Sequence, residues 1–128
     1  MHLSKRATTL CAAAWLALGG CTDTAPHDLA AGEAAIARDD PAEAIKMFER
    51  VIDARDQPPN TRAVAYVGRG VTYQNEGRYD EALADYDRAI GLMPTLAEAY
   101  VNRASIYVIK GQYERGLADY DRALALKP

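Results

Sequence analysis

The sequence contains few of the residues on which catalytic and metal sites usually depend. Both cysteines, Cys11 and Cys21, and both histidines lie within the first 27 residues, and beyond that point there is a single serine, Ser105. The rest of the chain therefore cannot form a Ser–His or Cys–His pair, nor a zinc site built on cysteine and histidine. We expect no catalytic residue, no metal and no cofactor.

Paired acids are the remaining alternative for catalysis. Asp85-x-Asp87 and Asp119-x-Asp121 each bring two carboxylates close together in the sequence, and in both pairs an arginine follows the first acid by three positions. Residues at that spacing are neighbours on the surface of a helix. We interpret these acids as solvated charges on a helix.

Strong charge of one sign is also missing. The 128 residues include 15 lysines and arginines and 18 acids, a net charge of −3, so the composition does not indicate a nucleic-acid partner. The length allows one domain, and 49% hydrophobic and 26% charged residues are ordinary for a globular protein. Because cysteine is absent after Cys21, that domain must hold together by packing alone.

A long hydrophobic run is absent as well, but a short one occupies the N-terminus. Lys5 and Arg6 precede an apolar run of about a dozen residues at 7–18, which is too short to remain in a bilayer as a spanning helix. The small residues Gly19 and Gly20 follow it. A basic head, a short apolar run and small residues are typical of a secretory signal peptide, which we predict over 1–20.

The end of this segment, Leu18-Gly19-Gly20-Cys21, resembles the bacterial lipobox. The resemblance implies that Cys21 is lipidated. Because Thr22 follows it, rather than the aspartate that retains lipoproteins in the inner membrane, the resemblance also implies the outer membrane, facing the periplasm. Acyl chains contribute about 0.8 kcal/mol per buried methylene, so two or more form a stable anchor, and we assign 21–27 to the lipidated cysteine and a polar tether. The alternative is a soluble secreted protein without a lipid anchor.

The remainder of the chain contains an internal repeat. Residues 63–94 and 97–128 align without a gap at an offset of 34, and 17 of the 32 positions are identical. All eight tyrosines fall in four equivalent positions, and within each copy they form two pairs seven positions apart, on one helix face each. Gly77 and Gly111 stand where glycine typically ends a helix. Each copy is therefore predicted to be a helical hairpin.

The pattern resembles the tetratricopeptide repeat. The signature of that repeat runs W-x2-L-G-x2-Y, then A-x3-F, then P, and the first copy has Tyr66-x2-Arg69-Gly70-x2-Tyr73, then Ala82-x3-Tyr86, then Pro94. Arg69 and its counterpart Arg103 stand where the family has leucine. The resemblance implies an all-α, right-handed superhelical solenoid of helix-turn-helix hairpins that binds other proteins.

A degenerate copy precedes these two. Ala44-Ile45-x2-Phe48 matches the core of the second helix, and Asp39-Asp40-Pro41 takes the place of the glycine turn, with Asp40 as N-cap. The link to the next copy is four residues longer than the period requires. We predict about three hairpins within 28–128, with repeats at 28–58, 63–96 and 97–128 and helices at 28–38, 41–54, 62–76, 79–91, 96–110 and 113–126.

The resemblance also implies where a partner binds, because the first helices of such hairpins line a concave face. We predict that this face binds a helix or an extended peptide of another protein, with contacts at Val67, Gln74, Asn75, Glu98, Val101, Asn102, Ser105 and Val108. Further positions that map to the face are Leu29, Glu33, Ile36, Val64, Val71 and Ile109, of which Val64 and Val71 are better suited to the core. The face lacks the basic residues with which some family members hold a peptide carboxylate, which disfavours binding of chaperone tails. Together with the lipobox, this predicts a lipid-anchored scaffold or adaptor of the bacterial cell envelope.

Two arginines are expected to form ion pairs. Arg69 and Asp85 are sixteen residues apart, and so are Arg103 and Asp119 in the next copy. Each arginine replaces the family's leucine on the side facing its own hairpin. A long arginine stem can fill the space of leucine while its head meets a carboxylate.

The last helix is expected to carry an uncovered apolar face, because the repeat ends at Pro128 without a polar capping helix. A partner protein, a second copy of the chain or a further repeat of a longer array would cover it, and Gly116 would allow another helix to come close. The alternative to an adaptor is a structural module that associates with itself. The apolar side chains of this face are Tyr113, Leu117, Tyr120, Leu124 and Leu126.

Overall fold

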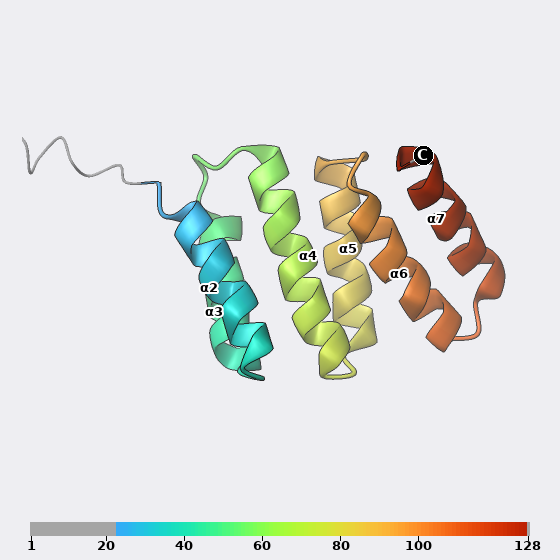
Figure 1. The fold of residues 1–128 in the computed structure, drawn as a ribbon, viewed down its shortest axis with the longest axis horizontal. Helices are drawn as coiled ribbons and strands as arrows, with labels where there is room; N and C mark the ends of the chain where they lie inside the picture. The colour runs from blue at the N-terminus through green and yellow to red at the C-terminus, as the bar shows by residue number, and fades with distance from the viewer. Residues whose placement is uncertain (1–22, 128) are drawn as a thin grey trace, which may run out of the picture.

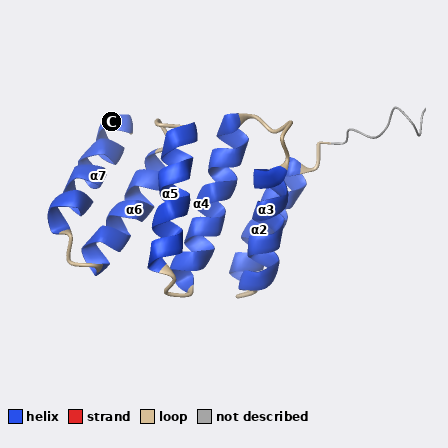
Figure 2. Ribbon diagram, turned by 180° about the vertical axis from the view of Figure 1, so that it is seen from behind, coloured by secondary structure: helices blue, strands red, loops and turns tan. Residues whose placement is uncertain are grey.

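The computed structural model describes residues 23–127, which fold into three helical hairpins stacked side by side in chain order (Figure 1). The helices are α2 Ala25–Ala37 and α3 Pro41–Asp53, then α4 Pro59–Asn75 and α5 Tyr79–Leu92, and finally α6 Ala97–Ile109 and α7 Tyr113–Leu126. Seen from behind, this part of the chain consists of helices and loops only (Figure 2), and none of its helices is long and apolar enough to cross a membrane. The predicted all-α solenoid of three hairpins is confirmed. The predicted signal peptide and Cys21 lie outside the described residues.

The first helix begins earlier than predicted. Four of the six helices start and end within one residue of the predicted positions, whereas α2 and α4 each start three residues sooner. Ala25 is buried, and its amide donates a hydrogen bond to the carboxylate of Asp23 at 3.1 Å. Residues 25–27, which we assigned to the tether, therefore belong to the folded array.

The four extra residues between the first two repeats form an additional turn of helix. α4 has 17 residues, whereas α2 and α6 have 13 each. In the extra turn, Arg62 Nε donates to the carbonyl oxygen of Ile52 at 3.1 Å, which satisfies an acceptor near the end of α3. The first repeat therefore aligns with the second at an offset of 38 residues, which pairs Ala25 with Ala63 and Asp39 with Gly77.

The tight turn inside each hairpin needs a residue with positive φ. Gly77 and Gly111 both have a φ of 74°, and Asp39 has a φ of 58° in the first hairpin. Glycine adopts this conformation without steric cost, and aspartate is among the few other residues that tolerate it. The carboxylate of Asp40 accepts a hydrogen bond from the amide of Glu43 at 3.1 Å, so the predicted N-cap is confirmed.

Aromatic rings packed against glycines hold the helices close together. Phe48 of α3 is buried, and its ring lies so close to Gly32 and Gly68 that an added Cβ would come within 2.6 Å and 2.4 Å of ring carbons. Tyr86 has the equivalent position in α5 and lies against Gly70, where an added Cβ would be 2.7 Å away. Side-chain carbons do not approach so closely in a packed core, so these glycines let the first helices contact the rings directly.

Arg69 connects three helices in the middle of the array. Its Nε and Nη2 atoms each donate to an oxygen of the Asp85 carboxylate at 2.9 Å, and its Nη1 lies 3.3 Å from the Glu49 carboxylate of the preceding hairpin. The guanidinium also lies 5.6 Å and 5.8 Å from the ring centres of Tyr66 and Tyr73, within the range of cation–π attraction. The predicted pairing of Arg69 with Asp85 is confirmed.

Arg103 repeats this arrangement in the last hairpin. It holds Asp119 through two hydrogen bonds of 2.7 Å and 2.8 Å and reaches Asp87 of the preceding hairpin at 2.8 Å. Asp85 and Asp119 are buried, so our interpretation of them as solvated charges was wrong: they point into the hairpin, where an arginine meets them. Their neighbours two positions later, Asp87 and Asp121, are exposed as expected.

Candidate functional site

The first helices of the three hairpins form one continuous face. α2 contacts α4, and α4 contacts α6. A hollow of about 260 Å³, here called the groove, crosses this face and is lined by Glu33, Ile36, Phe48, Val64, Val67, Gly68, Val71 and Glu98. Six of these eight residues were mapped to the face from the sequence. Phe48 was missed because it belongs to a second helix, and only the glycines opposite it let its ring reach the floor of the groove.

The valines of α4 divide between core and groove differently from our prediction. Val67, which we predicted to contact a partner, is 4% exposed and belongs to a core cluster with Tyr86 and Ile106. Val64, which we considered better suited to the core, is 38% exposed. Positions three apart on a helix differ by about 60° in direction, so a rotation of that size about the axis of α4 decides whether Val64 or Val67 faces the core. Val67 contributes to the floor of the groove and little to its accessible surface.

Exposed aliphatic side chains continue along α6. Val101, Val108 and Ile109 are 42%, 40% and 56% exposed. Val101 and Val108 were predicted as partner contacts, and the structure places both at the surface. None of the three lines the groove, and Val101 lines the hollow between α6 and α7 that is described below.

A chain of hydrogen bonds runs from Tyr86 of α5 through α4 to α6. The Tyr86 hydroxyl donates to Gln74 Oε1 at 2.8 Å, Gln74 Nε2 donates to Ser105 Oγ at 3.0 Å, and that hydroxyl donates to the carbonyl oxygen of Asn102 at 2.7 Å. Burial raises the pKa of Tyr86 well above its ordinary range, and the charges of Asp85 and Glu98 act in the same direction. Gln74 and Ser105, predicted as partner contacts, thus join α4 to α6, whereas Asn102, also predicted, takes part only through its backbone carbonyl within α6.

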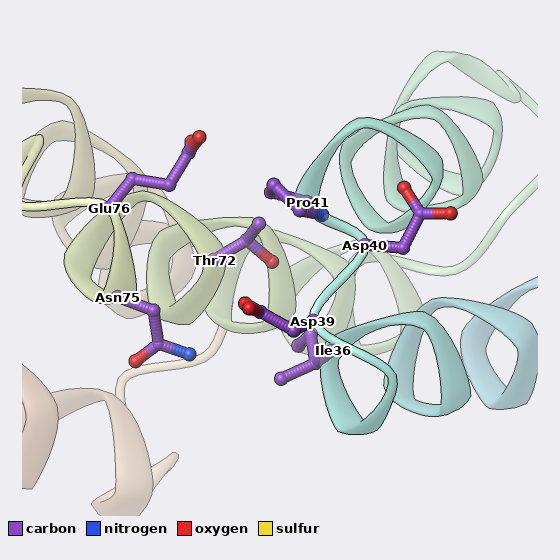
Figure 3. A pocket seen from close by; sticks show the side chains of 7 residues that line it. All are labelled: Ile36, Asp39, Asp40, Pro41, Thr72, Asn75 and Glu76. Atoms are coloured by element: carbon purple, nitrogen blue, oxygen red, sulfur yellow. The ribbon is translucent and has the colours of Figure 1, made fainter.

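Asn75 lies apart from the other predicted contacts. It lines a pocket of about 40 Å³ where the first turn meets the end of α4, with Ile36, Asp39, Asp40, Pro41, Thr72 and Glu76 (Figure 3). That volume holds about one to a few water molecules. Within residues 23–127, no group of acidic, histidine or cysteine side chains has the arrangement of a metal site.

A second apolar surface lies at the end of the array formed by α6 and α7. Tyr113, Leu117 and Leu124 are each more than 60% exposed, which confirms the predicted uncovered face of the last helix. A hollow of about 350 Å³ between the two helices, here called the end site, is lined by Ala97, Val101, Tyr120, Ala123, Leu124 and Lys127.

Gly116 does not belong to this open surface. An added Cβ would lie 3.0 Å from Val108 Cγ2 and 3.2 Å from the carbonyl oxygen of Ala104, both in α6. Our expectation that Gly116 allows an external helix to come close was therefore wrong. It lets α7 pack tightly against α6 of its own hairpin.

The repeats found in the sequence match a known family. Residues 63–96 and 97–128 each match the profile of the tetratricopeptide repeat, and together they cover slightly more than half of the chain. The chain belongs to the tetratricopeptide repeat family. These two ranges leave out the first hairpin, 25–53, which is the copy that has Asp39 in the turn and the additional residues before the second repeat.

Solved structures with the same fold include several tetratricopeptide domains. The second such domain of Spaghetti (RPAP3), bound to the HSP90 peptide SRMEEVD, is 23% identical, with a TM-score of 0.73 over 82% of this chain and 94% of that one. MamA is 25% identical, with a TM-score of 0.70 over 80% of this chain and 58% of MamA. The TPR2B domain of yeast Sti1, in its complex with Hsp70, is 23% identical, with a TM-score of 0.72 over 80% and 79%. A comparison with curated proteins found no match.

Proposed function

We propose that this tetratricopeptide repeat chain is a protein-binding adaptor whose groove holds a helix or an extended segment of another protein. The observation that carries the proposal is the hollow of about 260 Å³ on the face of the first helices, where aliphatic side chains, among them Val64 at 38% exposure, lie between Glu33 and Glu98. Contiguous apolar surface rimmed by polar residues is typical of binding sites, and helices and extended segments are the ligands that fit elongated grooves.

The charge of the groove favours a ligand with apolar side chains and basic neighbours. Glu33 and Glu98 line it, and none of the side chains that line it is basic. An acidic peptide such as the HSP90 peptide SRMEEVD, which the Spaghetti domain binds, would meet repulsion from these carboxylates. The ligand therefore differs in charge from that peptide.

The paired acids of the two later repeats do not favour a catalytic function. Asp85 and Asp119 are each occupied by two hydrogen bonds from an arginine. Both oxygens of each carboxylate are therefore already engaged by a side chain of the protein itself. The proposed function therefore assigns no catalytic residue.

We further propose that the adaptor is anchored by lipid at Cys21, in the bacterial outer membrane and facing the periplasm. The support is the lipobox-like Leu18–Cys21 and the signal-like 1–20. Because α2 begins at Ala25, only three residues separate Cys21 from the array. Three extended residues span about 10 Å, so the anchor would hold the array close to the bilayer surface.

A capture experiment tests the groove. The chain without residues 1–20 serves as bait in envelope extract, beside Val64→Lys and Glu98→Lys, which alter exposed positions of the groove. Ala84→Lys, at an exposed position of α5, is the matched control. We expect the partners of the unaltered chain to be lost with both groove variants and kept with the control. Capture of the same partners by all four baits would contradict the proposal.

A further inference from the structure

The end site is a second copy of a surface that the array covers in its interior. Each residue of the end site has a counterpart 34 positions earlier: Ala63, Val67, Tyr86, Ala89, Ile90 and Met93. All six counterparts belong to, or pack against, one core cluster, which also contains Ala99 and Ile106 of α6. The exposed fraction changes from 4% at Val67 to 42% at its counterpart Val101, because α6 covers the first and no described helix covers the second.

The way α6 covers the interior surface shows which side chains such a surface accepts. Ala99 and Ile106 are fully buried against it. Arg103 forms an ion pair with Asp87 at 2.8 Å, and the ammonium of Lys110 lies beside the carboxylate of Asp80. Counted from Ala99, Arg103 stands four positions later, Ile106 seven and Lys110 eleven. These spacings place all four residues on one side of a helix.

The end site keeps the two acids that meet these basic residues. The counterpart of Asp87 is Asp121, and the counterpart of Asp80 is Glu114. Both are exposed, and the ion pairs found within residues 23–127 include neither. The apolar hollow and both acids of the α6 interface therefore recur together at the end of the array.

We propose that the end site docks a basic amphipathic helix of another protein, which lies across α6 and α7 as α6 lies across α4 and α5. The helix presents a small and an aliphatic side chain to the hollow, and basic side chains to Asp121 and Glu114. This surface is distinct from the groove and adds a second interaction to the proposed function. The two surfaces have no lining residue in common.

A second copy of the chain fits the end site less well. Docking of a second copy's α2 would present Ala31 and Ala34 where α6 presents Arg103 and Ile106, at an offset of 72. At these two positions α2 has neither the arginine nor the large aliphatic side chain that α6 presents.

The chain itself supplies a probe for the test, a labelled synthetic peptide with the sequence of residues 95–112, which contains α6. Its binding to the full chain is followed by fluorescence anisotropy. We expect saturable binding that Asp121→Arg weakens about tenfold, as for the loss and reversal of one close charge pair. Replacement of the arginine of the peptide by glutamate should weaken binding to the unaltered chain and restore it to Asp121→Arg. Leu124→Asp, at a position that is 68% exposed, should also weaken it without affecting the fold.

Matched controls separate this site from the groove. Asp53→Arg reverses an exposed acid of α3 and should leave peptide binding unchanged, as should Val64→Lys in the groove. Peptide binding that is equally strong in Asp121→Arg and Leu124→Asp would overturn the proposal. So would sedimentation of the full chain as a dimer that Leu124→Asp dissociates, since a second copy would then occupy the end site. Either result leaves the groove proposal standing, because the groove is tested with different variants.

Discussion

Removal of one partner from the Arg69–Asp85 pair should cost much more stability than removal of a surface charge. The side chains of Arg69 and Asp85 are 13% and 2% exposed, and two hydrogen bonds of 2.9 Å join them. The hydrogen bonds that Arg69 donates to Asp85 raise the pKa of Arg69 above its already high ordinary value, so the guanidinium remains charged. A charge left alone at such a site loses its hydration without gaining a partner.

The cost should depend on which charge remains. Breaking a buried pair from one side costs about 3–5 kcal/mol. Arg69→Leu should lie near the upper end, because Asp85 then retains only Arg88, which is 3.6 Å away and 58% exposed. Asp85→Leu should lie near the lower end, since the longer Arg69 keeps Glu49 and can move its head towards water. The double variant should recover most of the loss, because well-packed apolar residues often replace a buried pair without net cost.

Urea unfolding followed by circular dichroism measures these differences, and the two single variants with the double variant form a thermodynamic cycle. The control is Lys46→Ala, which removes a surface pair with Glu43 whose side chains are 68% and 40% exposed; it should change the free energy of unfolding by at most about 1 kcal/mol. If Arg69→Leu costs no more than this control, or if the cycle shows no coupling, the reasoning is refuted. Should Arg69→Leu fail to fold, the same cycle on Arg103 and Asp119, which are 19% and 10% exposed, gives a milder version of the test.

Three other predictions follow from packing, titration and the N-terminal motif. Gly68→Ala should lower the free energy of unfolding by about 1–2 kcal/mol, because the new methyl overlaps the Phe48 ring, whereas Gly91→Ala, with no atom within 4 Å, should raise it by up to about 1 kcal/mol; urea unfolding of both variants checks the difference. Burial raises the pKa of Tyr86 above its ordinary 10, so this tyrosine contributes stability that is complete below about pH 10 and is lost as the pH rises further; unfolding across alkaline pH should show a shallower decline in Tyr86→Phe, and equal slopes would contradict it. Cys21→Ala should release the protein from membranes, and retention of the processed variant in the membrane fraction would count against the lipid anchor.

Local signals in the sequence predicted most of the fold. The period of 34 residues, the spacing of the tyrosines and the glycines at Gly77 and Gly111 indicated three hairpins, because helix faces and helix ends depend on neighbours along the chain. The same reasoning placed Asp39-Asp40-Pro41 where the later copies have the glycine turn, and the structure shows that Asp39 is the residue that adopts the positive φ. Co-occurrence of an arginine and an acid at the same spacing in two copies was enough to predict both ion pairs, whereas the burial of Asp85 and Asp119 was seen only in the folded hairpins.

The early start of α2 was missed because residues 22–27 are mostly polar and include Pro26, a composition typical of a flexible tether. The structure shows that Ala25 is buried and that Pro26 lies in the first turn of the helix. Proline is well accommodated in the first turn of a helix, so its presence there did not exclude a helical start. The extra turn of α4 was missed for a related reason. The longer link had the composition of a loop, and the contact of Arg62 with the end of α3 is visible only in the folded chain.

The sequence by itself thus determined the number of hairpins, their turns and their ion pairs, all of which rest on short-range spacing repeated along the chain. Only the tertiary structure decided which side of each helix is covered. Val64 is exposed and Val67 is buried because the rotation of α4 about its axis depends on the rings of Phe48 and Tyr86, which pack against glycines of α4. Gly116 faces α6, and Leu124 faces outwards, because the angle between α6 and α7 is set by all the side chains between them. Burial is a property of the packed array, and a surface for another protein is the part of each helix that this packing leaves uncovered.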